Sequence, residues 1–263
     1  MAVRDIQERE RHERETYRRV GSTGRSALAD EALRVPEHQI ERYQAVRPGS
    51  RARYTLEQMV SWAGPLPGRR VLELCCHDAE HGTILARLGA QVDAIDIAEP
   101  LIQQARRRAE INGVASRLTP KVMSAHALEY PDATFDVVFG KASLHHLDLT
   151  AARDEVYRVL RPGGVGVFAE PITYSRVLGA LRRVTPVPVD RESPDERQLT
   201  EAELREFCGP FASARFAHFH LLTRLSRVAP ALGHRLAGLD ATLMALLPPL
   251  RRLSGICVFA VTR

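Results

Sequence analysis

The 263-residue sequence predicts a doubly wound α/β domain, with a mostly parallel sheet of seven strands, N-terminal helices and a helical insertion before the last strand. Two observations indicate this fold class. Short apolar runs alternate along the chain with segments of helical character, as in parallel strands joined by right-handed crossovers. The runs are rich in Val, Leu and Ile with little polar alternation, which is typical of strands buried on both faces.

The elements of this domain follow in order from Arg70. Strands are expected at 71–76, 91–96, 117–123, 135–140 and 165–169, with two more at 214–219 and 255–262. Helices are expected at 80–89, 100–112 and 150–160, and a further helix should begin after Thr200, which is a suitable N-cap. The Rossmann-like domain therefore spans 69–263.

Residues 1–68 are expected to form a helical segment in front of this domain. The charged stretch 4–19 has few apolar residues and should form a solvated helix that docks weakly or frays, with further helices at 38–48 and 54–63. The apolar and basic insertion at about 221–252 has two interpretations. One is a basic amphipathic helix that lies on a membrane, and the other is a cap that covers an acceptor pocket or pairs two subunits as a homodimer. The cap is favoured because the insertion precedes the final strand.

Composition excludes several classes of protein. The chain has 44% hydrophobic residues and no apolar run long enough to span a bilayer, and its charged start does not resemble a signal peptide, so we expect a cytoplasmic protein without stable membrane insertion. The net charge of +5 arises from 37 basic and 32 acidic residues, largely interleaved, so no nucleic-acid partner is expected. The four cysteines show no CxxC spacing, and no metal site is expected.

Four sequence features lie where the expected strands end. They are VLELCCHDAEHG at 71–82, the acid Asp96, FDVVFGKASLHHL at 135–147 and RVLRPGG at 158–164. A doubly wound sheet binds its ligand beyond the carboxyl ends of its strands. A turn after the first strand presents backbone amides to a polar ligand, and an acid after the second strand accepts hydrogen bonds from ribose hydroxyls.

In this order the features resemble the class I S-adenosylmethionine-dependent methyltransferases, especially the bacterial branch that acts on small molecules. The pattern there runs VLDLGCGxG, a GxDIS-type second strand, FDVVxxxxxLHHL and RVLKPGG, and the resemblance covers about residues 69–170. It implies a Rossmann-like fold, S-adenosylmethionine as cofactor and a small-molecule acceptor.

The resemblance also implies a cofactor site in the loops after the first four strands. Asp96 would hold the ribose, and Glu73 would support the first loop and face the methionine end. Ser124 stands where the family usually has an acid before adenine. The other expected cofactor-binding residues are Cys75, His77, Ile97, Ala125 and Lys141.

The first loop departs from the family pattern. Three glycines are usual there, but their places are held by Cys75, His77 and Ala79, and Gly82 is a helical turn too far along to replace them. Glycine lets a ligand approach the backbone closely. His77 is therefore the most unusual residue of the chain, and this degenerate glycine loop leaves the mode of cofactor binding open.

Three residues are candidates for catalysis. Methyl transfer mainly requires the nucleophile to be positioned against the methyl group, and a general base helps when an O–H or N–H loses its proton. His145 and His146 follow the fourth strand and are candidates for that base; the alternative is that either ring supports the fold of its loop. Glu170 ends the fifth strand, where it would orient the acceptor or cap the loop.

The leading prediction is a methyltransferase that acts on a small, secondary-metabolite type of acceptor. A second hypothesis keeps the cofactor but uses it for cyclisation or decarboxylation without methyl transfer. A third is a non-catalytic partner protein that has lost the cofactor. A nicotinamide dehydrogenase is poorly supported, because no GxGxxG follows the first strand.

Overall fold

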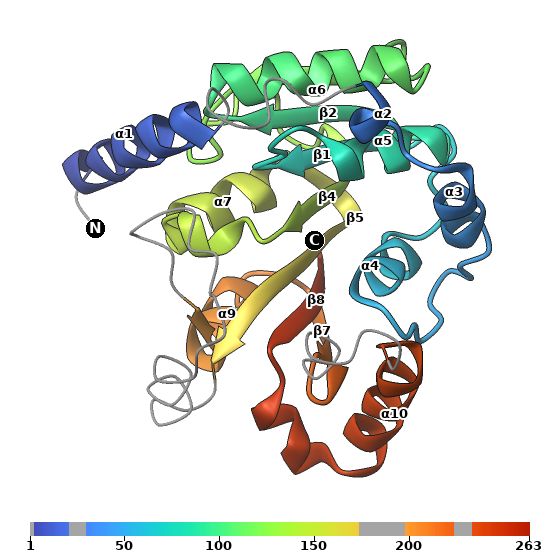
Figure 1. Cartoon of the computed structure of the whole chain (residues 1–263). Helices are drawn as coiled ribbons and strands as arrows, with labels where there is room; N and C mark the ends of the chain where they lie inside the picture. Colours follow the sequence, from blue (N-terminus) through green and yellow to red (C-terminus); the bar gives the residue numbers. More distant parts are fainter. Residues whose placement is uncertain (1–2, 21–29, 174–197, 224–232) are drawn as a thin grey trace.

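A mixed sheet with helices on both faces forms the centre of the molecule (Figure 1). The computed structural model describes residues 3–20, 30–173, 198–223 and 233–263. Within these residues the strands are β1 (Arg70–Leu74), β2 (Gln91–Asp96), β3 (Leu118–Val122), β4 (Phe135–Lys141), β5 (Leu160–Thr173), β6 (Leu199–Thr200), β7 (Ser213–Phe219) and β8 (Ile256–Thr262). They lie in the order β3-β2-β1-β4-β5-β8-β7, with β6 paired to β5 off this path.

The first five strands are parallel, while β8 inserts antiparallel between β5 and β7. This confirms the Rossmann-like fold predicted from the sequence. The number of strands was wrong, since the described residues contain eight rather than seven. β5 continues past the predicted end at residue 169, and its last two residues pair with the two-residue strand β6.

Most helices around the sheet begin and end close to the predicted residues, but the short helix α2 (Asp30–Leu33) was not predicted. The others are α3 (Glu37–Gln44), α4 (Thr55–Ala63), α5 (Glu80–Arg87), α6 (Glu99–Ile111), α7 (Leu149–Val159), α9 (Glu201–Cys208) and α10 (Gly233–Leu246). Thr200 caps α9 as expected, since its hydroxyl accepts from the Glu203 amide and the Glu203 carboxylate accepts from the Thr200 amide. None of the described helices combines the length and the apolar character that crossing a bilayer requires.

Side chains of the parallel strands alternate between two apolar cores, one on each face of the sheet. Val71 packs with Met59 of α4 and Ile102 of α6, whereas its neighbour Leu72 packs with Val156 of α7. All four side chains are almost fully buried. Burial on both faces explains why the strand sequences lack polar alternation.

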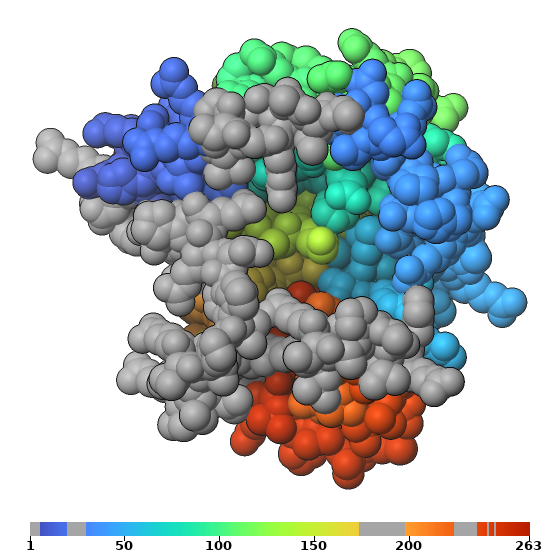
Figure 2. Space-filling view, viewed as in Figure 1, coloured from blue at the N-terminus to red at the C-terminus, as the bar shows by residue number. Residues whose placement is uncertain are grey.

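Helix α1 and the described part of the 221–252 insertion lie on different sides of the molecule. Helix α1 (Val3–Val20) lies on the left in Figures 1 and 2, away from α2–α4 on the right, while α10 lies at the bottom. The described part of the 221–252 insertion, α10 followed by the 3₁₀ helix η5 (Pro248–Leu253), packs against β7. The predicted break near Pro248 is confirmed, whereas the one near Pro230 lies outside the described residues.

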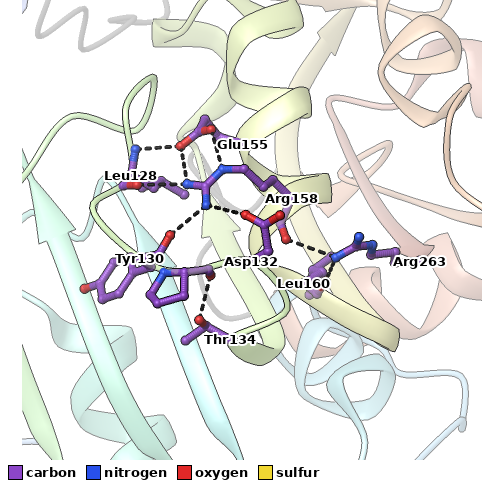
Figure 3. Close-up of polar contacts among 9 residues, drawn as sticks. Leu128, Tyr130, Asp132, Thr134, Glu155, Arg158, Leu160 and Arg263 are labelled. Atoms are coloured by element: carbon purple, nitrogen blue, oxygen red, sulfur yellow. Dashed lines mark hydrogen bonds and ion pairs between the residues drawn. The ribbon is translucent and has the colours of Figure 1, made fainter.

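A network of hydrogen bonds and ion pairs around Arg158, in the last turn of α7, holds the amino edge of the sheet (Figure 3). The Arg158 guanidinium donates to the carbonyls of Tyr130 and Leu128 at 2.7 and 2.8 Å and pairs with Glu155 and Asp132, both at 2.9 Å. The Arg158 backbone carbonyl in turn accepts from Arg263. The loop before β4 is thereby fixed to α7, at the edge opposite the candidate site.

Candidate functional site

A cavity of about 400 Å³ lies at the carboxyl ends of β1, β2 and β4. Its wall is formed by the loops that follow β1, β2, β3 and β4, and α1 closes one side. This volume is in the range of small-molecule sites. The cavity therefore lies where a doubly wound fold places its ligand.

The loop after β1 keeps a backbone conformation that glycine normally adopts. Cys75, His77 and Ala79 have φ angles of 49°, 53° and 54°, in the left-handed region. For residues with a Cβ this conformation costs about 1–2 kcal/mol each. The side chains of Cys75 and His77 line the cavity, where a glycine would leave open space. The loop has thus kept its course although its glycines are gone.

Backbone hydrogen bonds hold this loop in its strained course. The Cys76 amide donates to the Ile95 carbonyl at 2.9 Å, and the Ala79 amide donates to the Cys76 carbonyl at 2.8 Å. The His77 amide donates to the Asp96 carboxylate at 3.0 Å. The loop after β1 is therefore tied directly to the end of β2.

A buried ion pair adds a further anchor. Arg108 of α6 contacts the Asp78 carboxylate at 2.6 Å and donates to the carbonyls of Asp78 and Leu33 at 3.0 Å. Burial by itself raises the pKa of Asp78, but the neighbouring His77 and Arg108 lower it well below its usual range. Asp78 is consequently ionised at any physiological pH, and it secures the loop to α6.

Asp96 is placed to serve both the loop and a ligand. Its two oxygens accept from the Ala98 and His77 amides, both at 3.0 Å. Burial raises its pKa, and these amides oppose that rise. A carboxylate has about four lone-pair positions, so acceptor capacity remains for a ligand in the cavity that Asp96 lines.

Glu73 lies beneath the loop and does not line the cavity. Burial raises its pKa to about 8, helped by the nearby carboxylates of Asp78 and Asp96. A Cβ added at Gly82 would lie 2.4 Å from Glu73 Oε2, so Gly82 makes room for this carboxyl group. His81 Nδ1 lies 3.7 Å from Glu73 Oε1, but burial lowers the pKa of His81 to about 3. Both groups are uncharged at neutral pH, and their contact is not an ion pair.

The turn after β4 is held by Glu170. One oxygen of this fully buried carboxylate accepts from the amides of Ser143 and Leu144 at 2.9 Å, and the other lies 2.7 Å from His145 Nδ1. Because the carboxylate only accepts, it fixes the proton of His145 on Nδ1. The His146 ring lies against that of His145, with 4.1 Å between the ring centres. Glu170 itself does not line the cavity.

Helix α1 covers the cavity, which corrects the expectation that it docks weakly. Glu10 contacts His126 Nδ1 at 2.7 Å and accepts from the Ser124 hydroxyl. His126 Nε2 accepts from the Asp148 amide at 2.9 Å, so its Nδ1 carries the proton donated to Glu10. Burial raises the pKa of Glu10, but these hydrogen bonds outweigh it and lower the pKa overall. The charged helix docks because its charges find partners.

Three further residues of α1 reach the turn after β4. The Tyr17 hydroxyl lies 3.4 Å from His146 Nε2, and Glu13 Oε2 lies 3.5 Å from His146 Nδ1. Arg9 donates to the His145 carbonyl at 3.1 Å. The signal for this docking is the helical spacing of Ile6, Glu10, Glu13 and Tyr17, which places them on one face of α1.

The cavity brings together most of the residues that the sequence indicated. Those that line it are Cys75, His77, Asp96, Ile97, Ala125, Lys141, His145 and His146. Glu73, Ser124 and Glu170 lie outside its lining, and each supports a neighbouring segment. Glu10, Glu13, Tyr17 and His126 also line the cavity and were not anticipated.

Comparison with known proteins agrees with this arrangement. Residues 71–164 match the family described as methyltransferase domain. This segment is therefore similar to a methyltransferase domain, over about a third of the chain. It is the part that the sequence analysis had singled out.

Curated relatives match about two fifths of this chain. The 27-O-demethylrifamycin SV methyltransferase of Amycolatopsis mediterranei is 38% identical over 107 residues, 39% of this chain and 39% of that protein. A ubiquinone/menaquinone biosynthesis C-methyltransferase of Cereibacter sphaeroides is 31% identical over 111 residues, 41% of this chain and 44% of that protein. The chain thus spans about two fifths of the length of the curated relatives it matches.

Solved structures share the fold over most of the chain. Geranyl diphosphate C-methyltransferase from Streptomyces coelicolor A3(2), solved with Mg²⁺, geranyl diphosphate and S-adenosyl-L-homocysteine, has a TM-score of 0.60 at 13% identity and covers 95% of this chain and 96% of its own. The [4+2]-cyclase SpnF has a TM-score of 0.55 at 19% identity, covering 82% and 85%. At these identities the likeness shows the fold alone.

Proposed function

We propose that the protein binds S-adenosylmethionine in the 400 Å³ cavity and transfers its methyl group to a small-molecule acceptor. The observation that supports this most is the loop after β1, which keeps the left-handed course at residues 75, 77 and 79 and is tied through the His77 amide to Asp96. These residues fit the cofactor. His77 lines the cavity, and its Nε2 atom is buried and has no hydrogen-bond partner among the described residues.

Residues of four loops would hold the cofactor. Asp96 would accept from the ribose, with Ile97 beside it, and Ala125 supplies apolar surface for the adenine ring. The loop at Cys75 and His77 would face the methionine end. Lys141 lines the same cavity and adds a positive charge for the carboxylate of that amino-acid group.

The bound cofactor supplies an electrophilic methyl group on a sulfonium. The chain must place the acceptor in line and take up its proton. His146 is suited to be that base, because it lines the cavity and contacts Glu13 and Tyr17 of α1. His145 is held by Glu170 and packs against His146, so it positions the ring of the base.

The acceptor is proposed to be a secondary metabolite. The relatives named above include a rifamycin methyltransferase and a geranyl diphosphate methyltransferase, both of which act on small natural products by name. Screening hydroxylated polyketides, phenols and terpenoids for release of S-adenosylhomocysteine tests this proposal. A product that carries one added methyl group for each S-adenosylhomocysteine released is the expected result.

The role of His146 is tested once an acceptor is found. His146→Ala should lower kcat by about 100-fold, the usual contribution of a general base, and leave cofactor affinity unchanged. His145→Ala should lower both kcat and the thermal midpoint, because the buried Glu170 carboxylate also loses its hydrogen bond to His145. If both variants keep the wild-type rate from pH 6 to pH 9, neither histidine is the base.

A second candidate function is cyclisation or decarboxylation with the cofactor as a spectator charge. It is favoured by the side chains of Cys75 and His77, which occupy space that glycines would leave in the cavity. One structural neighbour is the [4+2]-cyclase SpnF. Turnover without release of S-adenosylhomocysteine would support this function over methyl transfer.

A further inference from the structure

We propose that the His77 side chain binds the cofactor by a hydrogen bond, at a loop position where glycine is usual. The inference rests on the proposed cofactor site. Its point is that the most unusual residue of the loop is a specificity determinant rather than a tolerated substitution. The ligand chemistry it selects is a hydrogen-bond donor, either a ribose hydroxyl or the ammonium of the amino-acid group.

The backbone at His77 argues against mere filling of space. Its φ of 53° is strained for a residue with a ring on its Cβ, and strain of this kind persists where the surroundings fix it and often lies at functional sites. Ala79 has the same strain at 54°, but its side chain is a buried methyl group outside the cavity lining. The two positions therefore separate the effect of strain from the effect of the imidazole.

The imidazole is oriented by its neighbours. Nδ1 lies 3.7 Å from an oxygen of Asp78, which Arg108 holds in place. The carboxylate favours the proton on Nδ1, so Nε2 carries the lone pair. The Tyr17 ring of α1 lies edge-on to the imidazole, with ring centres 6.3 Å apart. The ring is thus confined from the loop side and from the helix side.

The Nε2 atom of His77 is a hydrogen-bond acceptor without a donor among the described residues. It is buried, although the His77 ring lines the cavity. A buried acceptor without a partner costs about 1–3 kcal/mol. A ligand that donates to Nε2 removes this cost. A ligand without a donor at that point leaves it in place, and this difference is the basis of the proposed selectivity.

The charge around the cavity favours the same class of group. The carboxylates of Glu10, Glu13, Asp78, Glu80 and Asp96 line the cavity together with a single described lysine, Lys141. Ammonium and hydroxyl donors suit such a surface better than anionic groups. His77 then adds a directional acceptor to a region that is already attractive to donors.

The experiment compares His77→Gly with the matched control Ala79→Gly by calorimetric titration with S-adenosylhomocysteine. Both substitutions relieve a left-handed φ, so neither should lower the thermal midpoint. His77→Gly should weaken binding at least 10-fold, whereas Ala79→Gly should leave it unchanged. His77→Asn should recover part of the affinity, because Asn tolerates left-handed φ and keeps a polar group.

Titration with 5′-methylthioadenosine, which keeps the ribose but lacks the amino-acid group, separates the two donors. Weakening for both ligands assigns the hydroxyl, and weakening for S-adenosylhomocysteine alone assigns the ammonium. Equal or tighter binding of S-adenosylhomocysteine by His77→Gly overturns the inference while leaving the proposed function intact. Absence of binding by both wild type and His77→Gly overturns the proposed function itself.

Discussion

The two edges of the sheet solve opposite problems. At the amino edge, the guanidinium of Arg158 donates to two carbonyls and pairs with two carboxylates. At the carboxyl edge, three residues without the freedom of glycine take a left-handed course, and His77 Nε2 is buried without a hydrogen-bond partner among the described residues. One edge is complete by itself, and the other has capacity that a ligand would use.

This contrast separates a region that stabilises the fold from a region with features of a ligand site. A network such as that of Arg158 contributes to stability and has no surplus donors to offer. The loop after β1 has a strained backbone and a buried acceptor without a partner among the described residues, His77 Nε2. Contacts with Asp78, Arg108 and Asp96 hold its conformation. Variants at the two edges should therefore divide into those that affect stability alone and those that also affect binding.

The largest effect is expected for Arg108→Ala, which should lower the free energy of unfolding by about 3–5 kcal/mol because Asp78 is left buried without its cation. Affinity for S-adenosylhomocysteine should fall as well, since the loop loses its anchor. Arg106→Ala is the control on the same helix, where the half-exposed pair with Glu99 contributes less than about 1 kcal/mol. Equal losses in chemical denaturation for the two variants would contradict this account.

Glu73 gives the carboxyl edge a predicted pH dependence. Its pKa is raised from the ordinary 4.5 to about 8, so between these values the folded chain binds a proton that the unfolded chain has released. The free energy of unfolding should fall by about 1.4 kcal/mol for each pH unit in this range and level off above pH 8. Glu73→Gln should reduce this slope in denaturant titrations at pH 5 to 8; an unchanged slope would assign the dependence to other groups.

A smaller effect is expected at the amino edge. Arg158→Ala should lower the free energy of unfolding by about 2 kcal/mol, because it leaves the carbonyls of Leu128 and Tyr130 without this donor. The cavity is formed at the other edge, so affinity for S-adenosylhomocysteine should stay within twofold of wild type. Weaker binding in calorimetry would show that the two edges are coupled, and the comparison drawn above would fail.

The sheet could be predicted from the sequence because its strands are buried on both faces. The apolar runs at Val71 and Val137 reflect that burial directly. The sequence also placed Asp96 and His146 at the cavity, because the ends of parallel strands share one edge. The docking of α1 could not be predicted, because Glu10 and Glu13 have the pattern of solvated charges in the local sequence. Their partners, His126 and His146, are far along the chain. Long-range pairing of polar groups leaves little trace in local sequence.

The same limit applies to the β1 loop. The sequence showed that glycines were missing, but the left-handed φ at His77 and its hydrogen bond to Asp96 depend on contacts between β1 and β2 that only the fold reveals. The missing glycines left the mode of cofactor binding open. The structure shows a left-handed backbone at Cys75, His77 and Ala79 that hydrogen bonds to neighbouring residues hold in place.

Calorimetric titration of the wild-type protein with S-adenosylmethionine and S-adenosylhomocysteine tests whether this carboxyl edge binds the cofactor. We expect micromolar binding of both ligands, lost in Asp96→Ala and retained in Arg158→Ala. Absence of heat with wild type, for a protein shown to be folded by its thermal transition, would contradict cofactor binding at this edge. The chain would then be better explained as a non-catalytic partner protein.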